Sequence, residues 1–280
     1  MAPNRGTPPD RLQKVGAPSF LSPMESFRVT RRENGVVTIS LQRPEKKNAI
    51  NYPMWGALAS AIDEVAASKT DRVLVLTGSE DSFCAGADLA GEMEADRHQL
   101  SRMHYINKLP LALYECPKPT IAKVNGIAAG AGVNLAIGCD LVVASDRARF
   151  SEIFVKRALT VDLGGTWLLP RQIGIHRAKE LALFGDIISA AEADRIGLVN
   201  RVVPHAELDA FVDDWANRLA DGPPLAMQMS KQLLNAGLTS SLQEALNAEA
   251  MAQSVNFASE DTPAAVSAFF RKTTAKFRGL

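Results

Sequence analysis

The chain has 280 residues, of which 46% are hydrophobic and 22% are charged, as in an ordinary soluble globular protein. Lys and Arg together number 31, and Asp and Glu also number 31, so no overall field favours nucleic acid or an anionic membrane as a partner. The three cysteines lack CxxC or CxxH spacing, which argues against a zinc site or a disulfide framework and favours a reducing, cytoplasmic setting.

The N-terminal segment, residues 1–25, is rich in Pro, Gly, Ser and charge and lacks the apolar stretch of a secretion signal. We therefore expect a flexible extension there. No apolar run in the chain approaches the roughly 18 to 20 residues that are needed to span a bilayer, so the sequence gives no membrane partner.

The first folded elements are predicted from turn and periodicity signals. Residues 27–41 contain two alternating segments around Asn34-Gly35, which predicts a β-hairpin. Apolar residues from Trp55 to Val65 recur at helical spacing and predict a helix. The β-branched run at residues 72–78 is typical of a strand buried on both faces of a parallel sheet.

Two loops of small residues are the most informative part of the chain. Residues 82–89 follow the strand just described, and residues 125–132 follow a strand that ends at Val124. A helix with apolar residues from Met103 to Leu113 separates them, and another helix begins near Gly130. The repeated order of strand, loop and helix predicts an α/β fold whose parallel sheet places both loops at the carboxyl ends of its strands, where ligands bind.

The rest of the chain is predicted to be mostly helical. Strands are expected at residues 141–144 and 198–203. The division that we predict is a core of residues 26–204 and a helical C-terminal region of residues 205–280, of a kind that often docks on a neighbouring subunit. Helices are expected at residues 190–196, 205–219, 224–236, 242–257 and 263–271.

The two loops are suited to holding a negatively charged oxygen. Small residues let a ligand approach the main chain, and the unpaired N–H groups of a first helical turn attract developing negative charge. An enolate formed by removing a proton next to a thioester carbonyl is unstable in water, and each aligned donor can contribute roughly 2.7 to 4 kcal/mol to its stabilisation. Such a site also needs a base near the carbon that loses the proton.

From about Phe27 to the C-terminus, the sequence resembles the crotonase, or enoyl-CoA hydratase/isomerase, superfamily. The resemblance implies a crotonase-type ββα-repeat core, a C-terminal helical region for oligomerisation and CoA binding, homotrimers often paired as dimers of trimers, and acyl-CoA substrates without a separate cofactor. Its markers, in order, are RPEKKNAI at 43–50, FCAGADL at 83–89, VNGIAAGAG at 124–132, LGGTWLLPR at 163–171 and GDIISAAEADRIGLVNRVV at 185–203.

The resemblance also implies roles for individual residues. Ala87 and Ala131 match the two N–H donors of the family's oxyanion hole, although the second position usually carries glycine; alanine can serve there if its φ is negative. The positions that match CoA-binding residues are Lys47, Ala49, Ala85, Asp88, Leu89, Phe269 and Lys272. Asn134, Phe154, Trp167 and the segment from residue 92 to 105 are expected to shape the acyl pocket.

The catalytic positions depart from those of a hydratase. Family hydratases carry one glutamate where this chain has Asn134 and a second where it has Phe154, and both are needed to deliver water and a proton. Asp162 instead matches an aspartate of the family's isomerases, including the epoxyphenylacetyl-CoA isomerase. One carboxylate is enough for a 1,3-proton shift, so double-bond isomerisation is the favoured reaction, with Glu152 as a possible second carboxylate.

Several alternatives stay open on the sequence alone. Asp162 in isolation is typical of a helix N-cap, and Glu152 of a solvated or salt-bridged strand residue. The chain could also be a hydratase that uses an atypical carboxylate, or a non-catalytic acyl-CoA-binding protein. A dinucleotide fingerprint fails because Leu135 stands where glycine is required, Cys84 reads as an inert core residue, and the four histidines have no metal-ligand spacing.

Overall fold

The computed structural model describes residues 26–90 and 98–280, in which the chain forms two β-sheets. The N-terminal extension and residues 92–97 of the segment expected to shape the acyl pocket lie outside these ranges. The larger sheet has the order β1 (Phe27–Arg31), β2 (Val36–Leu41), β3 (Val73–Gly78), β5 (Thr120–Val124), β7 (Leu141–Ser145) and β10 (Arg201–Val203). The smaller sheet has the order β4 (Ser82–Cys84), β6 (Ile127–Ala129), β8 (Arg149–Ser151) and β9 (Ile188–Ser189).

The larger sheet confirms the predicted hairpin and the parallel strands. β1 pairs antiparallel with β2 across the Asn34-Gly35 turn, where Gly35 has φ +84. The neighbouring pairs from β2 through β3, β5 and β7 to β10 are all parallel. The carboxyl ends of the parallel strands therefore lie along the same edge of the sheet. The sequence predicted the two small-residue loops at this edge.

The predicted helices are present in the predicted order, with differences in their bounds. The single helix expected between Met103 and Leu113 is two helices, because Pro110 has no N–H to donate to the Ile106 carbonyl and its ring clashes with that group. The α-helices are α1 (Tyr52–Ala67), α2 (Gln99–Ile106), α3 (Lys108–Glu115), α4 (Ala131–Ile137), α5 (Gly165–Ile173), α6 (Ile175–Phe184), α7 (Ala190–Arg195), α8 (Leu208–Ala220), α9 (Pro224–Gly237), α10 (Leu242–Ala258) and α11 (Asp261–Arg271). The described residues also form three 3₁₀ helices, η1 (Pro44–Lys46), η2 (Ile153–Arg157) and η3 (His205–Glu207).

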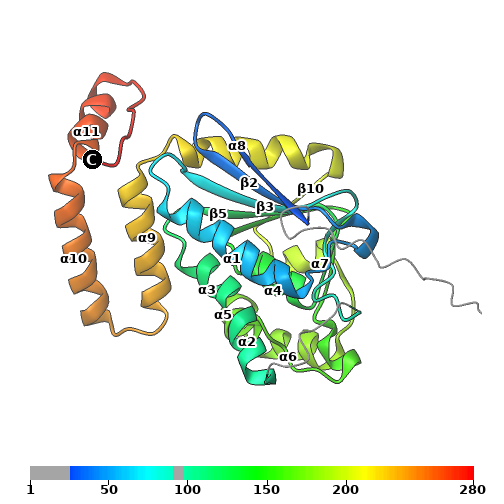
Figure 1. Cartoon of the computed structure of the whole chain (residues 1–280). Helices are drawn as coiled ribbons and strands as arrows, with labels where there is room; N and C mark the ends of the chain where they lie inside the picture. Colours follow the sequence, from blue (N-terminus) through cyan, green and yellow to red (C-terminus); the bar gives the residue numbers. More distant parts are fainter. Residues whose placement is uncertain (1–25, 91–97) are drawn as a thin grey trace, which may run out of the picture.

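The larger sheet is covered on both faces (Figure 1). Alternate residues of β3 point to opposite sides: Leu74 and Leu76 join the main core with α1, α3 and α4, whereas Val73 and Val75 join a second cluster under α8. Both faces are apolar, which explains why the sequence of this strand is a continuous hydrophobic run rather than an alternating one.

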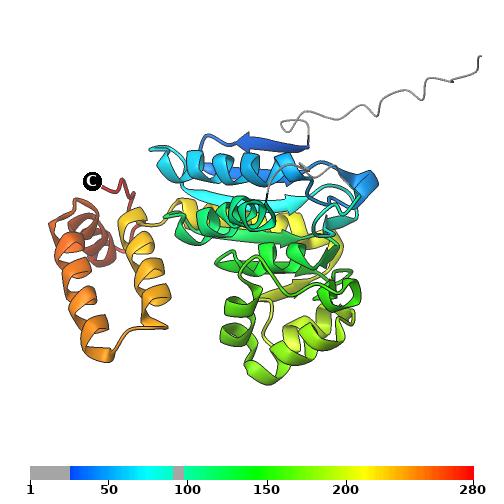
Figure 2. The same cartoon turned by 60° about the horizontal axis from the view of Figure 1, so that its bottom comes forward.

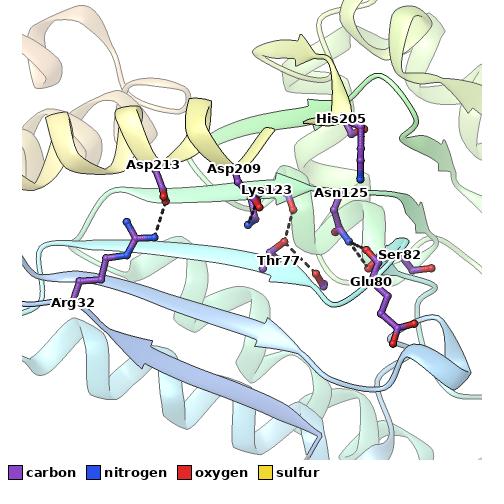
Figure 3. A network of polar contacts seen from close by, with 11 residues as sticks. Arg32, Thr77, Glu80, Ser82, Lys123, Asn125, His205, Asp209 and Asp213 are labelled. Carbon is purple, nitrogen blue, oxygen red and sulfur yellow. Dashed lines mark hydrogen bonds and ion pairs between the residues drawn. The ribbon is translucent and has the colours of Figure 1, made fainter. Parts of the chain in front are cut away.

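Helix α8 is attached to the sheet mainly by apolar contacts. Its Leu208, Val212 and Ala216 are buried against the second cluster. Two ion pairs flank them, with Lys123 Nζ 2.6 Å from Asp209 and the Arg32 guanidinium 2.8 Å from Asp213 (Figure 3). Because both aspartates lie at the surface, each pair contributes at most about 1 kcal/mol, so the buried aliphatic side chains stabilise this interface more.

The last three helices, α9 to α11, form a layer to one side of the sheets and cover neither face of the larger sheet (Figures 1 and 2). Helices α9 and α10 bury none of their side chains. Exposed apolar residues gather here, as is typical of an association surface, and the expected trimer stays a prediction. These exposed residues are Leu234, Leu238, Leu242, Leu246, Met251, Val255, Phe257, Val266, Phe269 and Phe270. Within the described ranges, no helix combines the length and the apolar character needed to cross a membrane.

Candidate active site

The two small-residue loops lie backbone against backbone. β4 pairs in parallel with β6, so the residues that follow each strand emerge side by side. A Cβ atom added at Gly132 would collide with the Cys84 carbonyl oxygen. At Gly86, whose φ is +95, an added Cβ would lie 2.8 Å from the Ala129 oxygen and 3.5 Å from the Ala131 nitrogen. Glycine is therefore required at both positions, and the Ala131 N–H group lies close to the loop that carries Ala87.

The N–H groups of Ala87 and Ala131 make no hydrogen bond within the described strands and helices. The Ile50 N–H donates to the Gly86 carbonyl at 2.8 Å and the Ile50 carbonyl accepts from the Asp88 N–H at 2.9 Å, so the intervening Ala87 N–H points away from Ile50. Ala131 is the first residue of α4, where an N–H has no helical acceptor. In the described part of the chain, neither group donates to a protein acceptor. Both N–H groups are therefore available to a ligand.

Asp162 lies in the turn before α5, and its interpretation as the N-cap of that helix is wrong. The N-cap is Gly164, which has φ +78 and makes no side-chain cap bond. Only the Asp162 carbonyl is used, accepting from the Gly165 N–H at 2.9 Å and from the Asn134 amide at 3.0 Å. The side-chain Oδ1 is buried without a partner in the described structure, and burial raises the pKa of Asp162 to about 6.

Glu152 is not the solvated strand residue that its sequence position indicates. The strand β8 ends at Ser151, and the chain turns into η2, which leaves Glu152 only 1% exposed. Its Oε2 accepts from the Asn134 amide at 3.5 Å. Burial raises the pKa of Glu152 to about 8; the Asn134 hydrogen bond opposes this effect, and the nearby charge of Asp162 adds to it.

Asn134 joins the two carboxyl-bearing segments. It is 1% exposed on α4, and its amide nitrogen donates to both the Glu152 carboxyl and the Asp162 main chain. A Cβ atom on Gly165 would collide with the same amide, so glycine at this position lets α5 approach α4. The position that carries a glutamate in hydratases therefore holds an amide that fixes the Asp162 turn.

An apolar cavity of about 370 Å³ opens beside Asn134 and the Asp162 turn. Trp167 forms part of its wall, with the Tyr114 ring edge-on at 5.4 Å and the Arg171 guanidinium stacked at 4.0 Å. Phe154 lies outside this lining and is buried beside Gly130 at the start of α4. The lining residues are Asn107, Pro110, Leu111, Leu113, Tyr114, Asn134, Leu135, Gly138, Leu163, Gly164, Trp167 and Leu168.

The residues expected to bind CoA divide into two groups. Lys47, Ala49, Ala85 and Asp88 lie together, because the Ala85 N–H donates to the Lys47 carbonyl at 2.9 Å; Leu89 is 65% exposed on the same loop. Phe269 and Lys272 lie at the end of α11, away from α4 in Figures 1 and 2. This chain does not bring the second group into its own site.

Arg43 ties the two loops of the first group together, a role that sequence reasoning missed although Arg43 opens the RPEKKNAI segment. It donates to the Asp88 carboxylate at 2.7 Å and to the Ala49 carbonyl at 2.6 Å. Although burial alone would raise it, the pKa of Asp88 is lowered by hydrogen bonds from Arg43 and from the Ala90 N–H and by the charges of Arg43 and Lys46. The charged pair is largely buried, at 11% and 8% side-chain exposure.

Replacing Arg43 by Leu is therefore expected to destabilise the protein and weaken acyl-CoA binding, because the Asp88 carboxylate loses its cationic partner. Breaking a buried pair costs about 3 to 5 kcal/mol. Chemical denaturation measures the free energy of unfolding, and KM measures binding. The double variant R43L/D88L removes the unpaired charge and should recover part of the lost stability; no recovery would contradict this account.

Metal and thiol chemistry find no support among the described residues. No group of three or more His, Cys, Asp or Glu side chains is placed to hold a metal ion within residues 26–90 and 98–280. Cys84 is fully buried, and burial raises its pKa to about 12, which confirms that it is an inert core residue rather than a nucleophile.

Comparison with known proteins gives consistent matches along the chain. A family model described as enoyl-CoA hydratase/isomerase matches residues 31–279. The 1,2-epoxyphenylacetyl-CoA isomerase of Escherichia coli is 38% identical over 91% of this chain and 100% of its own length. The short-chain-enoyl-CoA hydratase of Clostridium acetobutylicum is 35% identical over 87% of this chain and 94% of its own length. The crystal structure of an enoyl-CoA hydratase from Bacillus anthracis superimposes on this chain with a TM-score of 0.86 and 31% sequence identity. The match covers 91% of this chain and 100% of that structure.

Proposed function

The chain belongs to the enoyl-CoA hydratase/isomerase family of enzymes, and on this premise we propose that it moves a double bond along the acyl chain of an acyl-CoA thioester. The observation that carries the proposal is the Asp162 carboxyl, which is partly desolvated, lacks a partner for Oδ1 and belongs to a turn whose next residues, Leu163 and Gly164, line an apolar cavity. At the two positions where hydratases carry glutamates, this chain has Asn134 and Phe154.

In the proposed reaction, the N–H groups of Ala87 and Ala131 bind the thioester oxygen of a 3-enoyl-CoA. Removal of a proton from the carbon next to the carbonyl sends its electron pair into that oxygen and forms an enolate. The two donors stabilise the charge at the atom where it develops, and they do so without reorganising. The substrate carries its own coenzyme A, so no further cofactor is proposed.

Asp162 takes that proton and returns it at the far end of the conjugated system. When the proton reaches the γ carbon, the electron pair leaves the oxygen and the double bond settles in the 2,3 position. No atom is gained or lost, so one carboxylate completes the cycle. The pKa of about 6 that burial gives Asp162 suits this task, because the group is ionised near neutral pH and still basic enough to accept a proton.

A second candidate reaction is hydration, which the proximity of Glu152 to Asp162 favours. Asn134 touches both segments, so a second carboxyl group is present, although at a different position from that in hydratases. Product analysis separates the two reactions, since hydration adds the mass of water and isomerisation leaves the mass unchanged. Binding without turnover of any enoyl-CoA would contradict both.

The assembly and location of the enzyme are part of the same proposal. The apolar side chains exposed on α9 to α11 support a homotrimer or a dimer of trimers, in which Phe269 and Lys272 reach a neighbour's CoA. The three free cysteines support a cytoplasmic setting. Light scattering coupled to size-exclusion chromatography measures the number of subunits.

Replacing Trp167 by Ala is expected to change acyl-chain preference more than chemistry. The substitution removes a large part of the cavity wall, so medium-chain and aromatic acyl groups lose contact area worth about 1 to 3 kcal/mol, or roughly 10- to 200-fold in kcat/KM. Short-chain substrates, which fill less of the cavity, should lose little. A uniform loss across a panel of acyl-CoAs would show that Trp167 does not shape the acyl pocket.

A further inference from the structure

Three buried acceptor atoms without partners belong to residues of one cluster beneath the proposed active site. They are the Oδ1 of Asn134, the Oε1 of Glu152 and the Oδ1 of Asp162. A buried acceptor without a donor costs about 1 to 3 kcal/mol, and more if it is charged. The cluster therefore has a shortage of hydrogen-bond donors that the protein groups alone, with both carboxyls ionised, leave unmet.

The two N–H groups of the Asn134 amide make hydrogen bonds of unequal length. The Asn134 amide lies 3.0 Å from the Asp162 carbonyl oxygen but 3.5 Å from the Glu152 Oε2, at the outer limit of a hydrogen bond. An ionised Glu152 would thus rely on one weak neutral donor. It would also face Asp162, whose negative charge disfavours a second anion nearby.

No cation from the surrounding elements is directed at Glu152 in the described structure. Helix α4 contains no charged residue. Helix α6 packs against η2, and the Nη1 of its Arg177 is buried without a partner, but no charge of this helix is among the causes that shift the pKa of Glu152. The other charged groups nearby are engaged elsewhere: Arg171 stacks on Trp167, and Lys156 pairs at the surface with Asp186. Among the described groups none neutralises Glu152, so a proton on its own carboxyl is the simplest source of positive charge.

We propose that Glu152 is a positioning residue that remains protonated during turnover, held by Asn134, so that the site in which Asp162 works carries a single negative charge. This inference rests on the proposed function. The neutral carboxyl supplies the missing donor, because its O–H can bond to one of the orphaned oxygens. The pKa of about 6 for Asp162 and of about 8 for Glu152 agree with a range near neutral pH in which only Asp162 is ionised.

The pH dependence of kcat/KM for isomerisation tests this proposal. The wild type should gain activity as Asp162 ionises near pH 6 and lose it, about tenfold per pH unit, as Glu152 ionises above pH 8. The variant Glu152→Gln keeps a neutral hydrogen-bonding group at every pH, so it should retain the rise and lose the fall. An alkaline fall identical to that of the wild type would overturn the proposal. Asp63→Asn, exposed on α1, is the control and should keep both limbs.

Infrared spectroscopy tests the proton without relying on activity. In protein labelled with ¹³C at the glutamate carboxyl, a protonated-carboxyl band that shifts with the label should be present at neutral pH in the wild type and in Asp162→Asn. It should be absent in Glu152→Gln, whose folding is checked by thermal unfolding. Absence of the band in the wild type would overturn the inference and leave the isomerase proposal standing. Conversely, full turnover by Asp162→Asn with the band present would overturn the role of Asp162 as the base and leave the protonation of Glu152 standing.

Discussion

Replacing Asp162 by Asn is expected to lower kcat for double-bond isomerisation by about 100-fold to 10,000-fold, the range typical of a lost general base. The amide has nearly the shape of the carboxyl but cannot accept the proton from the substrate. The main-chain carbonyl that bonds to Asn134 and Gly165 is unchanged, so the turn before α5 should keep its geometry. The change in absorbance as a 3-enoyl-CoA becomes conjugated measures the rate.

Two controls separate chemistry from folding and binding in this variant. Calorimetric titration with the product should give a Kd close to that of the wild type, because Asp162 is not among the expected CoA contacts. Asp186→Asn, which removes a surface carboxylate from the same half of the chain, should turn over normally. Unchanged turnover by Asp162→Asn would mean that another group removes the proton.

Replacing Ala131 by Pro is expected to lower kcat by roughly 100-fold to 1,000-fold, as removal of one oxyanion donor does. Proline has no N–H, and Ala131 is the first residue of α4, where proline fits the helix and costs no intrahelical hydrogen bond. The preceding residue, Gly130, has φ +53 and no Cβ to clash with the proline ring. The variant therefore removes the donor with the least change to the helix.

Ala131→Gly is the matched control for the proline variant. It keeps the N–H and places at this position the residue that the family usually has, so kcat should stay within a few-fold of the wild type. Single-turnover kinetics measures the chemical step directly, and thermal unfolding verifies that both variants fold. Wild-type turnover by Ala131→Pro would contradict a role for this N–H in holding the thioester oxygen.

The strands and helices of the larger sheet were predictable because each is long enough to show its period. The buried run of β3 and the apolar spacing of α1 are examples. The smaller sheet was not predicted, since β4, β6 and β8 have three residues each and β9 has two, too few for alternation to be seen. What the sequence shows there is small residues, whose packing role at Gly86 and Gly132 emerges only when the strands pair.

The sequence supplied candidate residues for the site but not the electrostatics around them. The assignments of Ala87, Ala131 and Asp162 come from the resemblance, and their roles stay predictions. The burial of Glu152 depends on Asn134, 18 residues earlier, and the Asp162 turn lies 28 residues beyond Asn134, so no local pattern records these contacts. Local propensity therefore favoured a solvent-exposed Glu152 and a capping Asp162, whereas tertiary contacts determine both environments.

The measurement that tests the central claim most directly is mass analysis of the product formed from a 3-enoyl-CoA by the wild type and by Asp162→Asn. The wild type should convert the substrate into a 2-enoyl-CoA of the same mass but different retention time, and the variant should do so at least about 100-fold more slowly. A wild-type product heavier by one water, formed at a rate that does not depend on Asp162, would contradict the account.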